Sequence, residues 1–145
     1  MQLKLWGAAL LLSTIPTLSQ ASDTALYLDF DQTVQAATKA GRLDGSVKFY
    51  LAGQTVPGKA DLRGEAVTNK KTNAFNKSDE EACDWALQSA LITLQDAAKK
   101  AGANAVMDIV SFYKRAPYSN AQKYECHAGT FVAGVALKGQ LANIK

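Results

Sequence analysis

Two cysteines, Cys83 and Cys126, are the only thiols in the chain, and they lie far apart in the sequence. A dithiol redox centre normally uses closely spaced cysteines, one of which has a lowered pKa. A structural zinc site needs further ligands in C-x-x-C or H-x-x-x-H spacing, and the sequence contains neither pattern. The main chemistries that remain are a disulfide bond and two buried free thiols.

His127 is the only histidine, and it lies in the run Glu125-Cys126-His127. Adjacent residues of an extended strand point to opposite faces, so Cys126 and His127 do not readily share one ion. His127 is therefore only a weak metal-ligand candidate. There is no G-x-S-x-G elbow for a nucleophilic serine. The sequence indicates no catalytic residue and no cofactor.

A basic segment, Asn69–Lys77, carries Lys70, Lys71 and Lys77 beside the aromatic Phe75. Such a combination can bind an anion or a partner protein, although a solvated loop often has the same composition. These three lysines and Phe75 are therefore weak binding candidates. The formal net charge of the whole chain is +3, which is too small to indicate nucleic-acid binding.

The N-terminal segment has the three-part layout of a secretory signal. Lys4 precedes the apolar run Leu5–Leu12, and Ala21 provides a small residue before a cleavage point. That run is much shorter than the roughly 20 apolar residues of a membrane-spanning helix. We predict that residues 1–21 are a signal peptide and that residues 22–145 form a single α+β domain in the periplasm, with no integral membrane segment. Disulfides persist in that compartment.

Hydrophobic periodicity and turn residues define the expected elements. In chain order these are a strand near 26–30, a helix at 31–40, strands at 46–51 and 62–68, a helix at about 79–101, and strands at 104–114 and 123–137. Ser78 and Glu81 form a capping box for the long helix, and Gly102 provides its stop. This order predicts an α+β fold with an antiparallel sheet, the long helix packed on one face, and a C-terminal β-hairpin.

These elements favour a disulfide between Cys83 and Cys126. Cys83 lies about 27 Å from the end of the long helix, at about 1.5 Å per residue. If the hairpin turns near Ser119, Cys126 lies opposite Phe112, about 26 Å along the returning strand at about 3.3 Å per residue. Both cysteines then reach the same end of the helix. The closed loop of about 40 residues corresponds to about 3–4 kcal/mol of stability.

Part of the chain resembles known envelope proteins. The junction Ala101–Met107 and the strand end Ala133–Leu137 resemble the putative heavy-metal-binding domain family of bacteria and the C-terminal domain of the envelope-stress lipoprotein RcsF. The resemblance covers about Leu62–Leu137 and implies a disulfide at Cys126. The lipoprotein's partner cysteine has no counterpart here, so Cys83 would replace it. No metal ligand carries over.

The whole chain is similar to small exported proteobacterial proteins described as "excinuclease ATPase subunit", through Leu43–Val47, Thr68–Asn73 and Ser78–Cys83. That description implies nucleotide and DNA ligands. The chain, however, has no G-x-x-x-x-G-K-[ST] loop to hold a triphosphate and no zinc-finger cysteine set. We therefore expect neither ATPase nor excinuclease activity.

These features predict a soluble periplasmic, non-enzymatic protein of the cell envelope. It would act through a binding or oligomerisation surface, with an unknown protein partner or by self-association. A metal-binding or metal-stress protein using His127 is the first alternative. An enzyme without a recognisable motif is the second.

Overall fold

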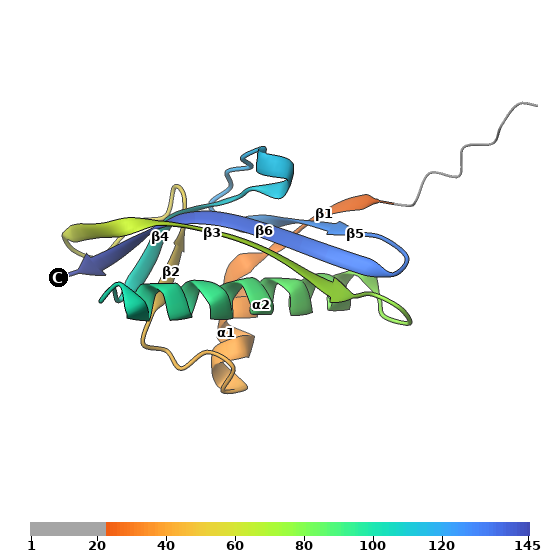
Figure 1. Ribbon diagram of the computed structural model, residues 1–145, viewed down its shortest axis with the longest axis horizontal. Helices are drawn as coiled ribbons and strands as arrows, with labels where there is room; N and C mark the ends of the chain where they lie inside the picture. Colours follow the sequence, from red (N-terminus) through yellow and green to blue (C-terminus); the bar gives the residue numbers. More distant parts are fainter. Residues whose placement is uncertain (1–22) are drawn as a thin grey trace, which may run out of the picture.

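The computed structural model describes residues 23–145, so the predicted signal peptide lies outside the described residues. This part of the chain has a mixed α/β fold, with a curled six-stranded sheet and two α-helices (Figure 1). The elements in order are β1 (Thr24–Asp29), α1 (Phe30–Lys39), β2 (Lys48–Leu51), β3 (Ala60–Asn73), α2 (Asp79–Lys100), β4 (Ala105–Ser111), the 3-10 helix η1 (Tyr113–Arg115), β5 (Lys123–Ala128) and β6 (Val132–Ile144). Neither α-helix of residues 23–145 is long and apolar enough to cross a membrane.

Strand β6 is the centre of the sheet. It pairs with β3 along one edge, and its other edge is shared by β4 and β5. Strand β1 extends the sheet beyond β5, and β2 extends it beyond β4. The β2–β4 pair is parallel, and β3 and α2 provide the long crossover connection that a parallel pair needs. The sheet is therefore antiparallel, as predicted, in every pairing of the described strands except the β2–β4 pair.

The C-terminal strands also differ from the prediction. The expected strand at 123–137 is divided by a turn in which the Gly129 N–H donates to the Val132 carbonyl at 2.8 Å. Strand β4 pairs with β6 rather than with β5, and β6 continues to Ile144. Gly139 interrupts the apolar pattern there because a Cβ at this position would lie 2.8 Å from Val106 Cγ1. The close approach of β4 to β6 requires a residue without a side chain.

Strand β3 is longer than the prediction of 62–68. It runs to Asn73, so the basic segment 69–77 begins inside a strand rather than a loop. Thr68 faces α2 and is buried, whereas Asn69 and Lys71 point the other way and are exposed. Polar residues are tolerated here because β3 has a strand on one side only, within the described chain.

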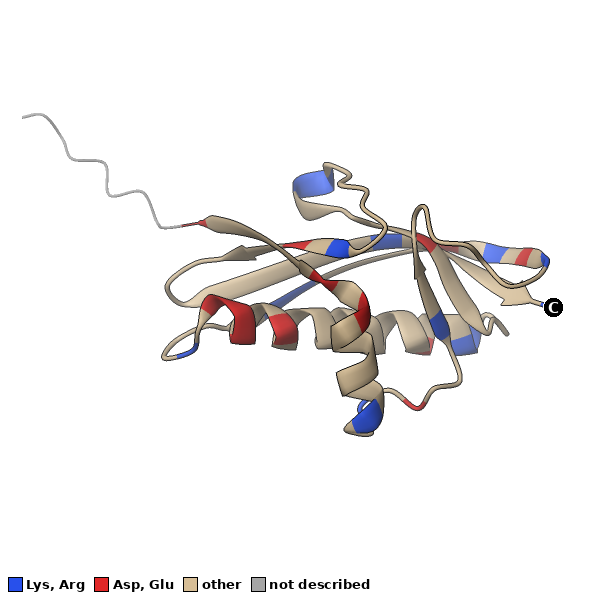
Figure 2. Ribbon diagram, turned by 180° about the vertical axis from the view of Figure 1, so that it is seen from behind, with Lys and Arg blue, Asp and Glu red and all other residues tan. Residues whose placement is uncertain are grey.

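The long helix begins and ends close to its predicted limits. The Ser78 side chain accepts a hydrogen bond from the Glu81 N–H at 3.1 Å, which satisfies one free donor of the first turn. Three acidic residues occupy that first turn and two lysines the last, an arrangement that complements the helix dipole (Figure 2).

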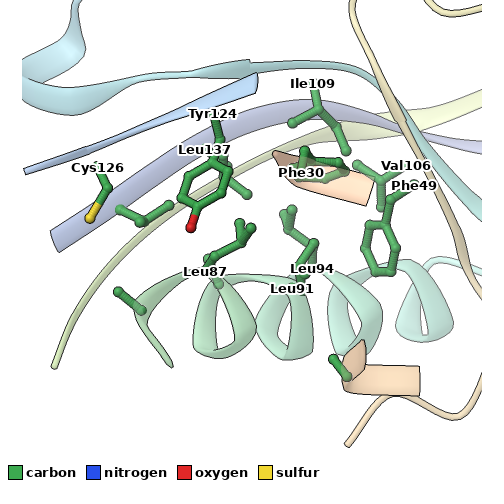
Figure 3. Packing of buried hydrophobic residues seen from close by; sticks show 14 of the residues in the cluster. Phe30, Phe49, Leu87, Leu91, Leu94, Val106, Ile109, Tyr124, Cys126 and Leu137 are labelled. Carbon is green, nitrogen blue, oxygen red and sulfur yellow. The ribbon is translucent and has the colours of Figure 1, made fainter. Parts of the chain in front are cut away.

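The core lies between α2 and the sheet. Leucines on one side of α2 point toward apolar side chains of β4 and β6 (Figure 3). The largest of its fully buried apolar side chains are Phe30, Leu87, Leu91, Leu94, Val106, Ile109, Tyr124, Val135 and Leu137. This layer covers the face of the sheet that is turned toward α2, which we call the inner face. The opposite face is the outer face.

Tyr124 should make the protein sensitive to alkali. Burial raises the pKa of its phenol above the usual value, and the neighbouring Asp84 carboxylate adds to this shift. The phenol thus stays protonated in the fold, while the unfolded chain ionises it above pH about 10. Its contribution to stability is fully present below that pH and is lost as the pH rises further. The free energy of unfolding should therefore fall less steeply above pH about 10 in Tyr124→Phe than in the wild type.

Urea unfolding followed by circular dichroism at several alkaline pH values measures this difference. Tyr50→Phe, at a half-buried tyrosine of β2, is the matched control for the loss of a phenol hydroxyl. If the free energy of unfolding falls equally steeply with pH in Tyr124→Phe and the wild type, Tyr124 ionises equally in the folded and unfolded chains.

Candidate functional site

A disulfide joins Cys83 in the first turns of α2 to Cys126 in β5, and it confirms the predicted pairing. The two Cα atoms are 5.9 Å apart, and both residues are completely buried. Cys126 reaches the helix because β5 lies between β1 and β6, not through the expected hairpin with β4. Since Cys126 points inward, its neighbours Glu125 and His127 point to the outer face.

Aromatic and acidic side chains gather around these two residues on the outer face. The loop that contains η1 lies over this face, on the side of the sheet away from both α-helices (Figure 1). We call the group the tyrosine–histidine cluster, and its members are Asp23, Tyr27, Tyr113, Tyr118, Glu125 and His127.

The His127 ring is held by three neighbours. The Tyr113 ring stacks on it, with centroids 3.5 Å apart and planes inclined by 10°. Its Nδ1 lies 3.2 Å from Asp23 Oδ1, and its Nε2 lies 3.5 Å from Glu125 Oε2. Nε2 is buried and makes no hydrogen bond within the described residues. The imidazole is thus fixed in position with a carboxylate at each nitrogen.

This arrangement does not suit a metal site. The two carboxylates lie beside different nitrogens of the ring, so they do not converge with either nitrogen on one ion. Within residues 23–145, no three histidine, cysteine, aspartate or glutamate side chains are grouped to hold a metal ion. His127 is placed instead as a structural partner of Tyr113 and of two acidic side chains.

The tyrosines hold the carboxylates in turn. The Tyr113 hydroxyl donates to Asp23 Oδ2, and the Tyr27 hydroxyl donates to Glu125 Oε2. Both hydrogen bonds have an oxygen–oxygen distance of 3.4 Å. The pKa of both phenols is raised, first by burial and then by these carboxylates. The Tyr118 ring lies 4.8 Å from that of Tyr27. The phenols of Tyr27 and Tyr113 therefore remain hydrogen-bond donors well above neutral pH.

The loop over the cluster is tied down at its base and strained at its tip. Ser111 and Tyr118 exchange two backbone hydrogen bonds of 3.0 and 2.8 Å, and Ser111 Oγ accepts from the Glu125 N–H at 2.9 Å. Lys114 and Arg115 both adopt left-handed backbone angles, with φ of 51° and 61°. Such residues cost about 1–2 kcal/mol each and often occur at functional sites.

Two hollows adjoin His127. The larger, of about 430 Å³, lies beneath the loop between Tyr113, Tyr118 and Glu125. The smaller, of about 170 Å³, extends past His127 toward Gly134 and Lys71. Both are open and mix polar with aromatic walls, so the outer face offers a shaped surface rather than an enclosed pocket.

The four predicted binding candidates do not form one surface. Lys71 points to the outer face and lines the smaller hollow, whereas Lys70 is on the inner side of β3. The physical reason is that consecutive residues of a strand point to opposite faces. Phe75 and Lys77 lie in the turn after β3. The prediction that residues 69–77 form one basic connection is therefore wrong.

The turn after β3 has its own contacts. The Phe75 ring stacks on Phe131, with centroids 6.1 Å apart, and both rings are more than half exposed. Lys77 Nζ donates to the Asn73 carbonyl at 2.9 Å. This turn is therefore a separate, partly apolar tip of the molecule.

Comparison with known proteins provides no function for these features: no protein-family model, no curated protein and no solved structure matches the chain.

Proposed function

We propose that the chain is an exported, periplasmic, non-enzymatic protein of the cell envelope that binds a protein partner through the tyrosine–histidine cluster. The observation that carries this proposal is the gathering of three tyrosines and His127 on the outer face, supported by fixed carboxylates. With the long helix α2 packed on the inner face, that outer face is left for a partner.

The chemistry of the cluster favours binding over catalysis. A general base must present a nitrogen to its substrate, but each nitrogen of His127 already has a carboxylate beside it and Tyr113 covers the ring. The side chain of His127 is 16 % exposed. Fixing the ring in this way orients Tyr113 and the two acidic groups for contact.

The composition of the cluster favours a protein as the partner. Tyrosine provides a rigid apolar body with a polar tip, and it is enriched among the residues that dominate protein interfaces. Tyr27 is 44 % exposed. Acidic groups at the centre and lysines at the rim, such as Lys71 and Lys114, offer charge complementarity in both signs.

The export part of the proposal is supported by the predicted signal peptide and by the disulfide, since disulfides are common in oxidising compartments and rare in the cytosol. Cys83 and Cys126 are paired, and no free cysteine is present in residues 23–145.

Site-specific photo-crosslinking in the native host tests the proposal. A photoreactive amino acid at position 118 of the full chain should give a discrete protein adduct in the periplasmic fraction. The same residue at position 35, an exposed site on α1, is the matched control and should give none. Equal adducts at both positions, or none at 118, would contradict a binding role for the cluster.

A further inference from the structure

Strand β3 presents a long free edge. It has 14 residues, and within the described chain it pairs with β6 alone. An unpaired edge of this length is a template for another strand, and proteins usually shorten, cover or charge such edges. The edge shares only Lys71 with the partner site proposed above.

The direction of the backbone groups along β3 follows from two hydrogen bonds. The Ala74 N–H donates to the Phe131 carbonyl at 2.8 Å, which extends the register in which Thr72 faces Ala133. In this antiparallel ladder the even-numbered residues from 66 onward therefore bond to β6. The Asn73 carbonyl instead accepts from Lys77 Nζ. The backbone groups of residues 65, 67, 69 and 71 thus point away from β6.

We infer that two copies of the chain pair antiparallel through their β3 edges, with the two-fold axis at Thr68. The free N–H and C=O groups of the two β3 strands face each other only when odd-numbered residues of one copy lie opposite odd-numbered residues of the other. Among those registers, this one places Glu65 opposite Lys71 of the second copy, twice by symmetry. Glu65 and Lys71 are both exposed and on the outer face, so each pair is attractive.

The same register brings the two Thr68 residues directly opposite each other. Thr68 then belongs to a non-hydrogen-bonded pair, in which Cα atoms are about 4.5 Å apart. A register displaced by two residues loses the two charge pairs.

The ends of the strand also match. Leu62 and Phe75, which flank Thr68 at similar distances along the chain, are 59 % and 56 % exposed. Antiparallel pairing brings the Leu62 end of one copy to the Phe75 end of the other. The apolar side chains of Leu62 and Phe75, which are exposed in the single chain, thereby come close to the second copy.

Sedimentation velocity from micromolar to millimolar concentration, with the mature chain, tests the inference. The wild type should dimerise. Val67→Pro should be monomeric, because proline removes only an N–H that points to the free edge. Val67→Ala keeps that N–H and should still dimerise. Circular dichroism and the intact disulfide verify folding of each variant. A wild type that is monomeric throughout, or a dimer that persists in Val67→Pro, would overturn the inference.

A charge exchange tests the register. Glu65→Lys or Lys71→Glu alone turns two attractive pairs into repulsive ones and should weaken the dimer at least about threefold. The double variant should restore it. Glu65 also lies 3.7 Å from Lys138 in its own chain, but that contact does not explain rescue by Lys71→Glu. Single variants without effect, or a double variant that fails to recover, would reject this register.

Discussion

Replacing Cys83 and Cys126 together by alanine should lower the free energy of unfolding by about 3–4 kcal/mol. The disulfide closes a loop between residues separated by 43 positions, and closing such a loop reduces the entropy of the unfolded chain. Both cysteines are completely buried, so removal also leaves two small voids. Urea unfolding with a common slope for both proteins measures the loss.

Reduction of the wild type provides the control for this pair. The reduced protein and the double variant should unfold at similar urea concentrations, both well below the oxidised wild type. A difference of less than about 1 kcal/mol between oxidised wild type and double variant would show that the disulfide adds little to the fold. Because Cys126 lies between Glu125 and His127, the double variant should also weaken the crosslink at position 118.

Phe30→Ala should cost about 3–5 kcal/mol of unfolding free energy. Phe30 is the first residue of α1 and is completely buried. Its side chain lies in the cluster that contains Val106 and Ile109 (Figure 3), and truncation leaves a large cavity that the sheet cannot fill. Since small domains have only about 5–15 kcal/mol of stability in total, the loss should be visible as a large shift in thermal midpoint.

Phe131→Ala is the matched control, because Phe131 is the same residue type but is 64 % exposed. Its midpoint should remain close to that of the wild type, since surface substitutions usually change stability by less than about 0.5 kcal/mol. Similar shifts for the two variants would mean that Phe30 is not part of the core.

The long helix could be predicted from the sequence because its signals are local. Ser78 and Gly102 mark the limits of α2 with residues whose conformational preferences are strong. The pairing of Cys83 with Cys126 was favoured by the length of the elements between them. The structure contains this disulfide, although β5, which carries Cys126, pairs with β1 and β6 and not with β4 as predicted.

The strand pairings could not be predicted, because they depend on contacts between distant segments. The turn at Gly129 divides the expected strand 123–137, whose residues 128–137 include no proline or charge to mark a break. The far end of β3 is polar, and Lys70 and Lys71 suggested a loop. Only the pairing with β6 shows that this stretch is an edge strand.

The tyrosine–histidine cluster was likewise hidden in the sequence. Its members come from the segment before β1, from β1 itself, from the η1 loop and from β5, and no short motif joins them. One signal was present: Tyr27, Glu125 and His127 each alternate with apolar residues that face the core. That alternation places them on the outer face, but it does not show that β1 and β5 are neighbours.

The two proposals reinforce each other geometrically. A two-fold axis through paired β3 edges is perpendicular to the sheet, so both outer faces of the dimer are on the same side. Two tyrosine–histidine clusters would then be presented to one partner surface. Such bivalency raises the apparent affinity without any new contact.

The yield of the adduct at position 118, compared between the wild-type background and Tyr113→Ala, tests the central claim most directly. Interface tyrosines of this kind contribute about 2 kcal/mol or more, so the apparent affinity should fall by about thirtyfold and the adduct should nearly disappear. Gln35→Ala should leave the yield unchanged. An adduct that persists at full yield in folded Tyr113→Ala would show that the cluster is not the binding surface.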